Sequence, residues 1–223
     1  MQNLVHYLRR QKKLLALLIL TMLWLSLFPA WVHRVTAKPL DDAITLSPSG
    51  TINREIEVAI PEHYEINLVF ERASLPFQEL KTLLGDWAYR DGQPIPSGVR
   101  VPVRWSLKKL HDGSIAASGE NDTFGAIAWS AAEVDRKVGG FRVKPGRYLF
   151  NAQVLHDVPA LAHIGTRLSI NLPSKASSTW QMTLVWWGSI ASYIVVWPAA
   201  AVIAMFLILQ AGRNFFSARA ART

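Results

Sequence analysis

The chain has 223 residues, of which half are hydrophobic, 24 are Lys or Arg, 16 are Asp or Glu and none is cysteine. All the acids and 17 of the basic residues lie between two long apolar blocks, so this middle segment has a net charge of only +1, too weak a field to hold a nucleic acid. The absence of cysteine excludes disulfides, thiolate metal sites and thiol catalysis.

The first apolar block, residues 14–32, is long enough to cross a membrane. At about 1.5 Å per residue it would extend roughly 28 Å, close to a hydrocarbon thickness of about 30 Å. The alternative is a cleaved signal peptide, with the cleavage site after Val35, Thr36 and Ala37. We favour a retained anchor because the apolar run is longer than a typical signal-peptide core. Both alternatives predict that the following segment is exported.

Basic residues flank the two blocks on their outer sides. Residues 1–13 and 210–223 contain no acid, and their cations are Arg9, Arg10, Lys12, Lys13, Arg213, Arg219 and Arg222. Cytoplasmic flanks collect Lys and Arg, so we expect both termini to be cytoplasmic and the middle to be exported. The same charges favour contact with anionic membrane lipid.

The second block, residues 182–209, would extend about 42 Å as one helix, so it must tilt or leave its first turns among the headgroups. Pro198 is expected to interrupt it, because proline lacks the N–H of the helical hydrogen bond. Aromatic residues expected at the exported interface are Phe28, Trp31, Trp180, Trp186 and Trp187. Neither block contains Asp, Glu, Lys, Arg or His, which argues against ion or proton transport.

Four residues of the blocks are candidates for helix packing. Trp24 and Trp197 fall near mid-depth, and Gly188 and Ser192 form a pair of small residues four positions apart that permits close helix approach. The two helices could pack on each other, or these residues could form a face for another membrane subunit. We favour packing of the two helices on each other, because such pairs are common in apolar helices.

The middle segment, residues 38–173, has the alternating pattern of β-strands with one buried face. Apolar and polar residues alternate along residues 55–60, 64–71, 99–108, 148–154 and 166–172. Pro102 predicts that the third run is an edge strand or contains a bulge. A helix is expected from Pro76 to a stop at Gly85, and residues 126–137 are left open between a short helix and irregular structure. Six or seven short strands with frequent turns predict a mainly β protein, an antiparallel β-sandwich between two transmembrane helices.

Several stretches of the middle segment resemble an uncharacterised bacterial family. They are residues 134–148, with the sequence VDRKVGGFRVKPGRY, and residues 64–70, 98–103, 155–161 and 164–170. The family is known mostly from lipoproteins that carry a domain of unknown function, and the resemblance implies an exported immunoglobulin-like sandwich with no established activity or cofactor. The present chain has no cysteine to lipidate, so its helices would replace the lipid anchor in a bacterial inner membrane.

Catalytic and metal-binding patterns are weak. Ser106 and Lys109 match the S-x-x-K signature, but that signature needs a helix and a later K-T-G, whereas these residues lie on an alternating run. The potential metal ligands His156, Asp157 and His163 lack a characteristic spacing. We therefore expect no catalytic, cofactor or metal site, and no enzymatic activity.

The expected function is a membrane-anchored, periplasmic protein-binding module. Trp, Tyr and Arg dominate binding hot spots, so Trp87, Tyr89 and Arg90 in the 85–98 segment are the candidate partner contacts. By analogy with small envelope proteins of similar layout, the partner could be an antibacterial toxin that the protein neutralises. The alternative is a structural subunit of a larger inner-membrane complex, with the helices as its interaction surface.

Overall fold

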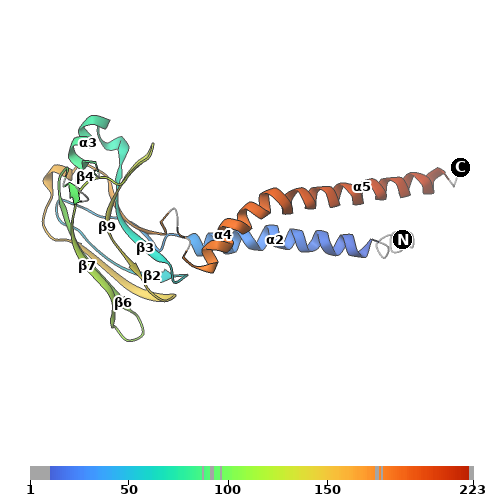
Figure 1. Cartoon of the computed structure of the whole chain (residues 1–223), viewed down its shortest axis with the longest axis horizontal. Helices are drawn as coiled ribbons and strands as arrows, with labels where there is room; N and C mark the ends of the chain where they lie inside the picture. Colours follow the sequence, from blue (N-terminus) through green and yellow to red (C-terminus); the bar gives the residue numbers. More distant parts are fainter. Residues whose placement is uncertain are drawn as a thin grey trace. The chain divides into compact units, whose positions relative to one another are not determined.

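The structure is a computed structural model that describes residues 11–220 except 87, 91, 92, 96, 174, 175 and 177. It divides into two compact units (Figure 1). One unit is Thr36–Thr179, and the other contains the two apolar helical segments.

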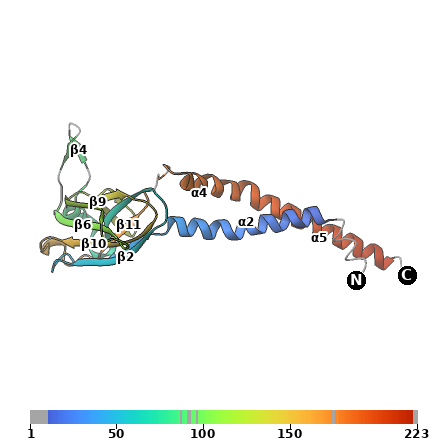
Figure 2. The same ribbon diagram turned by 90° about the horizontal axis from the view of Figure 1, so that it is seen from below.

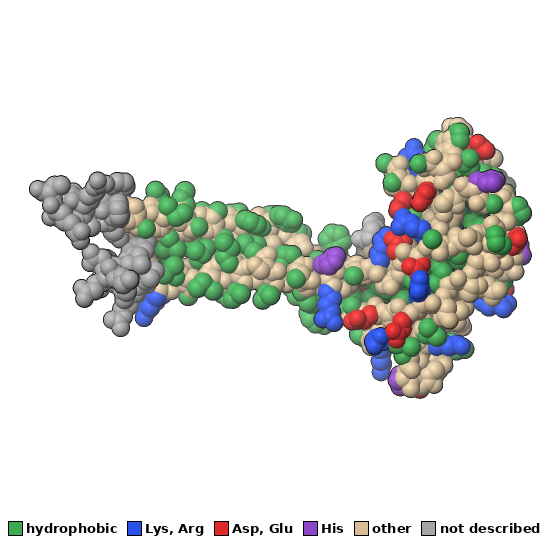
Figure 3. Space-filling view, turned by 180° about the vertical axis from the view of Figure 1, so that it is seen from behind, with side chains coloured by type: hydrophobic (Ala, Val, Ile, Leu, Met, Phe, Trp, Pro, Cys, Tyr) green, Lys and Arg blue, Asp and Glu red, His purple; other side chains and the backbone are tan. Residues whose placement is uncertain are grey.

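The helical unit contains α2 (Lys12–Thr36), α4 (Trp180–Ala191), a π-helical turn, η3 (Ser192–Val196), and α5 (Trp197–Ala220). Lys12–Thr36 and Trp180–Arg213 are long and apolar enough to cross a membrane, and hydrophobic side chains follow the helices in Figure 3. The interruption expected at Pro198 takes the form of the π-helical turn, where the N–H of Trp197 bonds the carbonyl of Ser192.

The other unit contains two antiparallel sheets. In the first, the strand order is β1 (Leu40–Ala43), β11 (Thr166–Asn171), β3 (His63–Glu71), β9 (Glu133–Arg142) and β8 (Ala128–Trp129). In the second, the order is β2 (Thr51–Val58), β10 (Gly146–Val154), β6 (Val101–Lys109) and β7 (Ile115–Thr123). A separate hairpin pairs β4 (Ala88–Arg90) with β5 (Gln93–Ile95). The mainly β architecture expected from the sequence is therefore confirmed.

Alternate residues of the strands form the core between the sheets. Fully buried examples are Leu68 and Phe70 on β3, Leu107 on β6, Phe150 on β10 and Leu168 on β11, and each such side chain contributes roughly 1.5–3 kcal/mol. Short elements complete the unit: η1 (Arg72–Ser74), α3 (Phe77–Leu84) and η2 (Pro159–Leu161). The predicted helix is confirmed as α3, and Gly85 ends it with φ of 69°.

The structure decides two expectations that the sequence left open. Residues 126–137 are not helical; they contain β8, the first half of β9 and short stretches outside the strands at 126–127 and 130–132. Strand β6, which contains Pro102, lies between β10 and β7 and is therefore not an edge strand. The alternative prediction, a bulge in this run, agrees with the register shift at Leu107 and Lys108. The Pro102 carbonyl accepts the Leu155 N–H at 3.0 Å, one residue beyond the last pair of β6 with β10, Val103 and Val154. Pro102 is tolerated because it lies at this end of the ladder, where its missing N–H removes one terminal bond at most.

The strand directions place both connections to the helices at one end of the sandwich. Residues 37–39 lead into β1 and residues 172–179 follow β11, and the loops at the same end are residues 59–62, 110–114 and 143–145. We call this the linker end. Here Glu62 accepts hydrogen bonds from the hydroxyls of Ser178 and Thr179 and from the Ser178 N–H, which ties the outgoing chain to the sandwich.

Candidate functional site

The β4–β5 hairpin stands away from the two sheets (Figure 2). It leaves the sandwich after α3 and returns just before β6, so both of its ends belong to well-packed parts of the fold. We call Gly85, Asp86, Ser97 and Gly98 the hairpin neck. These four residues determine how the hairpin is attached.

The two backbone segments of the neck approach each other closely. Both Gly85 and Gly98 have positive φ, 69° and 74°. A Cβ on Gly85 would lie 2.4 Å from the Ser97 carbonyl carbon, and one on Gly98 would lie 2.4 Å from the Leu84 backbone. Only glycine therefore fits at either position.

Hydrogen bonds fasten the neck to the sandwich and close the chain beside it. The carbonyls of Gly85 and Ser97 accept the N–H groups of Ala126 and Gly125 at 3.0 and 3.1 Å. Next to the neck, the Val99 N–H donates to the Leu83 carbonyl at 2.7 Å, which joins the segment before the neck to the segment after it. The neck thus has a defined orientation relative to the core.

Arg136 on β9 is the residue that joins both ends of the hairpin. Its side chain is fully buried, and its guanidinium donates to the carbonyl of Leu84 before the neck and, over 2.6 Å, to that of Val99 after it. The guanidinium carbon also lies 5.4 Å from the ring centre of Phe70. No carboxylate among the described residues pairs with Arg136, and burial lowers its pKa to about 10.

The predicted contact residues fall at this hairpin. Trp87 lies outside the described residues, and Tyr89 and Arg90 lie on β4, although their side chains are outside the described part. Sequence reasoning missed Arg136. The signal that could have found it is a single charged residue at the inward position between Val134 and Val138.

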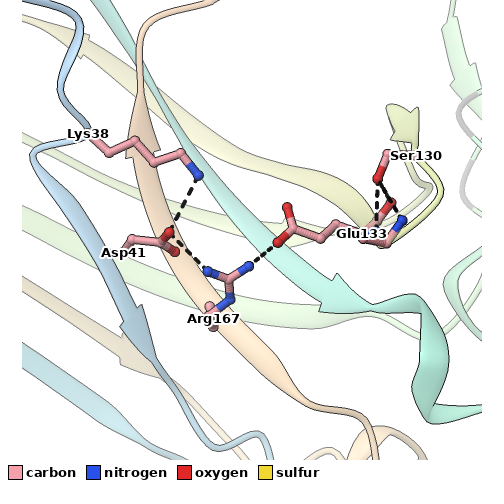
Figure 4. Close-up of polar contacts among 6 residues, drawn as sticks. Lys38, Asp41, Ser130, Glu133 and Arg167 are labelled. Atoms are coloured by element: carbon pink, nitrogen blue, oxygen red, sulfur yellow. Dashed lines mark hydrogen bonds and ion pairs between the residues drawn. The ribbon is translucent and has the colours of Figure 1, made fainter. Parts of the chain in front are cut away.

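A second polar cluster crosses the outer face of the five-stranded sheet (Figure 4). Arg167 on β11 lies between two acids, bonding Asp41 on β1 at 2.9 Å and Glu133 on β9, and Lys38 reaches Asp41 at 3.4 Å. Burial and the neighbouring Glu133 raise the pKa of Asp135. The charges of this cluster are matched within it, so it is best explained as a connection between strands.

The structure brings three of the four candidate helix-packing residues together. Trp24 donates to Ser192, and the ring of Phe28 lies against Gly188, where a Cβ would be 2.5 Å from it. Phe28 is therefore buried between the helices. Its expected depth at the exported membrane interface stays a prediction. Trp197 is 57% exposed and does not join this contact.

The residues of the weak catalytic and metal-binding patterns make ordinary structural contacts. Asp157 accepts the Ser49 N–H at 2.7 Å. Ser106 lies on β6 between Ser118 and Asn151 of the neighbouring strands. Among the described residues, no three His, Asp or Glu side chains gather as a metal site.

Comparison with known proteins identifies a family but no activity. A crystal structure of a protein from Sulfurospirillum deleyianum is similar to this chain with a TM-score of 0.49 and 16% identity, covering 61% of this chain and 98% of that one. A structure of the infectious bursal disease virus Gx strain gives a TM-score of 0.16 and 10% identity, covering 64% and 36%. No curated protein matches the sequence. Residues 37–172, more than half of the chain, match the model of the domain of unknown function DUF5625, and the protein therefore belongs to the DUF5625 family.

Proposed function

We propose that this protein is a membrane-anchored binding module that presents the β4–β5 hairpin to a protein partner. In this proposal the two apolar helices cross the bacterial inner membrane, both termini are cytoplasmic, and an immunoglobulin-like sandwich lies in the periplasm. The length and composition of the helices support the anchoring, and the basic outer flanks support the orientation.

The observation that carries the proposal is the attachment of the hairpin by Arg136. Burying a guanidinium without a carboxylate is costly, because the charge loses its hydration. Here its hydrogen bonds go to the two carbonyls that flank the neck. A hairpin held in one orientation loses little conformational entropy when it binds, and such preorganisation raises affinity. The hairpin sequence contains Trp87, Tyr89 and Arg90, which are residue types that anchor interfaces.

Site-specific photocrosslinking in the native host tests the proposal. The photoreactive residue p-benzoylphenylalanine replaces Tyr89 in one version of the full chain, Ser118 on the exposed face of β7 in a second, and Trp197 in a third. We expect one protein adduct from position 89, absent from position 118, and lost when Trp87 and Arg90 are changed to Ala. A secreted toxin as that adduct would identify the role as immunity.

The same experiment can contradict the proposal. Adducts with an integral membrane protein from position 197 alone would transfer the interaction to the helices and make the protein a structural subunit. Equal adducts from positions 89 and 118 would show that the hairpin has no special part in binding.

A further inference from the structure

A hollow of about 550 Å³ opens at the linker end of the sandwich. Its wall combines the end of β6, the start of β7 and the turn from β9 to β10. These segments are far apart in the sequence but meet because the loops of both sheets converge at this end.

Three cations line the hollow, Lys109, Arg142 and Lys144, and no acid does. Arg142 donates through Nε to the Pro61 carbonyl at 3.1 Å, which fixes its side chain and leaves its other nitrogens available. Lys109 has only a distant ion pair, 4.0 Å, with Asp112. Lys144 forms no ion pair with any described residue. The hollow thus concentrates positive charge.

Large apolar side chains are exposed beside these cations. Ile115, which lines the hollow, is 63% exposed, and Leu110 in the same β6–β7 loop region is 41% exposed. Only two other large hydrophobic side chains of the described sandwich, Phe77 and Ile127, are exposed, and both are less exposed than Ile115. Cations next to exposed aliphatic groups are the composition of surfaces that bind the headgroup layer of a bilayer.

We propose that this hollow binds the phosphate headgroup of an anionic phospholipid in the bilayer that the helices cross. The inference rests on the membrane anchoring proposed above. Both chain connections leave from the linker end, and only residues 37–39 separate α2 from β1. Since a residue spans at most about 3.6 Å, this short connection limits how far the start of β1 can lie from the bilayer in the proposed anchoring. Lys109, Arg142 and Lys144 would contact the phosphate, while Ile115 and Leu110 enter the interface.

The absence of cysteine makes a single-cysteine probe possible. The full chain with H111C, in the exposed β6–β7 loop, carries a fluorophore and is reconstituted in nanodiscs of phosphatidylcholine, with or without phosphatidylglycerol. A lipid with a spin-labelled headgroup quenches the fluorophore on contact. We expect strong quenching only with phosphatidylglycerol, and its loss when salt rises from about 0.1 M to about 1 M, which shortens the Debye length from about 10 to about 3 Å. A fluorophore on A131C, at the opposite end of the sandwich, should respond to neither lipid.

Charge variants distinguish attraction of the lipid to the cations of the hollow from attraction to the net charge of the sandwich. The degree of quenching gives the ratio of domains in contact with the lipid to domains free of it. K109Q/R142Q/K144Q should lower this ratio by about ten-fold or more. R54Q/R100Q/R104Q, which removes the same charge elsewhere, should leave the ratio unchanged. I115S, at an exposed position that tolerates a polar residue, should lower it without affecting the fold. Equal quenching in both nanodisc types, or equal losses in the two triple variants, would overturn the inference. A chain that elutes apart from the nanodiscs would instead contradict the anchoring.

Discussion

The indole N–H of Trp24 donates to the hydroxyl oxygen of Ser192 over 2.8 Å and so joins α2 to the π-helical turn of the second apolar segment. The Ser192 hydroxyl donates in turn to the Gly188 carbonyl at 2.7 Å. The Trp24 ring stacks on Phe28 with centroids 4.7 Å apart, and Phe28 occupies the space left by the missing side chain of Gly188. The hydrogen bond of Trp24 and the close packing of Phe28 on Gly188 therefore join the same two helical segments.

Replacing Gly188 by Leu should separate the two helices, because a Cβ there already overlaps the Phe28 ring at 2.5 Å. The Gln11 and Gln210 amides form a hydrogen bond across the pair, so a Q11C/Q210C chain treated with a short thiol crosslinker reports helix pairing. We expect G188L to lower the crosslinked fraction several-fold. G212L is the matched control, since nothing lies within 4 Å of a Cβ at Gly212. Similar crosslinking in the two variants would show that Gly188 does not set the helix distance.

The strands that could be predicted from the sequence are those whose alternation is uninterrupted. The runs 64–71 and 148–154 correspond to β3 and β10. On β10 every second residue is buried, whereas on β3 Asn67 and Val69, on the other face, are buried as well. β7 escaped prediction because it is an edge strand whose sequence, IAASGENDT, has few large apolar residues. β9 was left open because Arg136 occupies an inward position where the pattern calls for an apolar side chain.

The sequence predicted the residue types of the candidate site but not its geometry. Trp, Tyr and Arg in one loop suggested a binding surface, but nothing local indicated a hairpin on a fixed neck. The neck depends on Arg136, which lies about 50 residues further along the chain, and on Gly125 and Ala126. The cationic hollow likewise requires the register of three strand pairs, which brings Lys109 near Arg142. Contacts of this range follow from tertiary packing and not from periodicity.

Replacing Arg136 by Met should loosen the neck. The buried carbonyl of Leu84 and the half-buried carbonyl of Val99 would lose their donor. An unsatisfied buried group costs about 1–3 kcal/mol, and this cost is offset in part because the unpaired charge is also removed. We expect a net loss of about 2 kcal/mol in the free energy of unfolding, and faster amide hydrogen exchange at Val99, Gly125 and Ala126. R104M, which removes an exposed arginine from β6, should change stability by less than about 0.5 kcal/mol. Unchanged exchange at the three amides in R136M would contradict the role assigned to Arg136.

Replacing Gly98 by Ala should be more damaging than replacing Gly113. Both glycines have positive φ, 74° and 67°, so each substitution carries a backbone strain of about 1 kcal/mol. A Cβ at Gly98 would in addition lie 2.4 Å from the Leu84 backbone, whereas nothing lies within 4 Å of one at Gly113. The difference between the urea midpoints of G98A and G113A therefore isolates the close approach within the neck. Equal midpoints would show that the neck can widen without cost.

Glu62 should make the stability of the sandwich depend on pH. Burial alone would raise its pKa, but hydrogen bonds from Ser178, His63 and Thr179 outweigh burial and hold the pKa below its usual 4.5. The carboxylate therefore stabilises the folded state fully above about pH 4.5, and this contribution is lost as the pH falls through the lowered pKa.

In E62Q, an amide oxygen and an NH2 group replace the two carboxylate oxygens that accept these hydrogen bonds. Because the NH2 group cannot accept, we expect a lower free energy of unfolding than in the parent near neutral pH. Urea unfolding followed from pH 7 to pH 3 should show the two proteins converging on the acid side, because the parent then carries a neutral carboxyl group. E79Q, on the exposed side of α3, should behave as the parent at each pH. A gap between parent and E62Q that stays constant to pH 3 would mean that the hydrogen bonds to Glu62 do not depend on its charge.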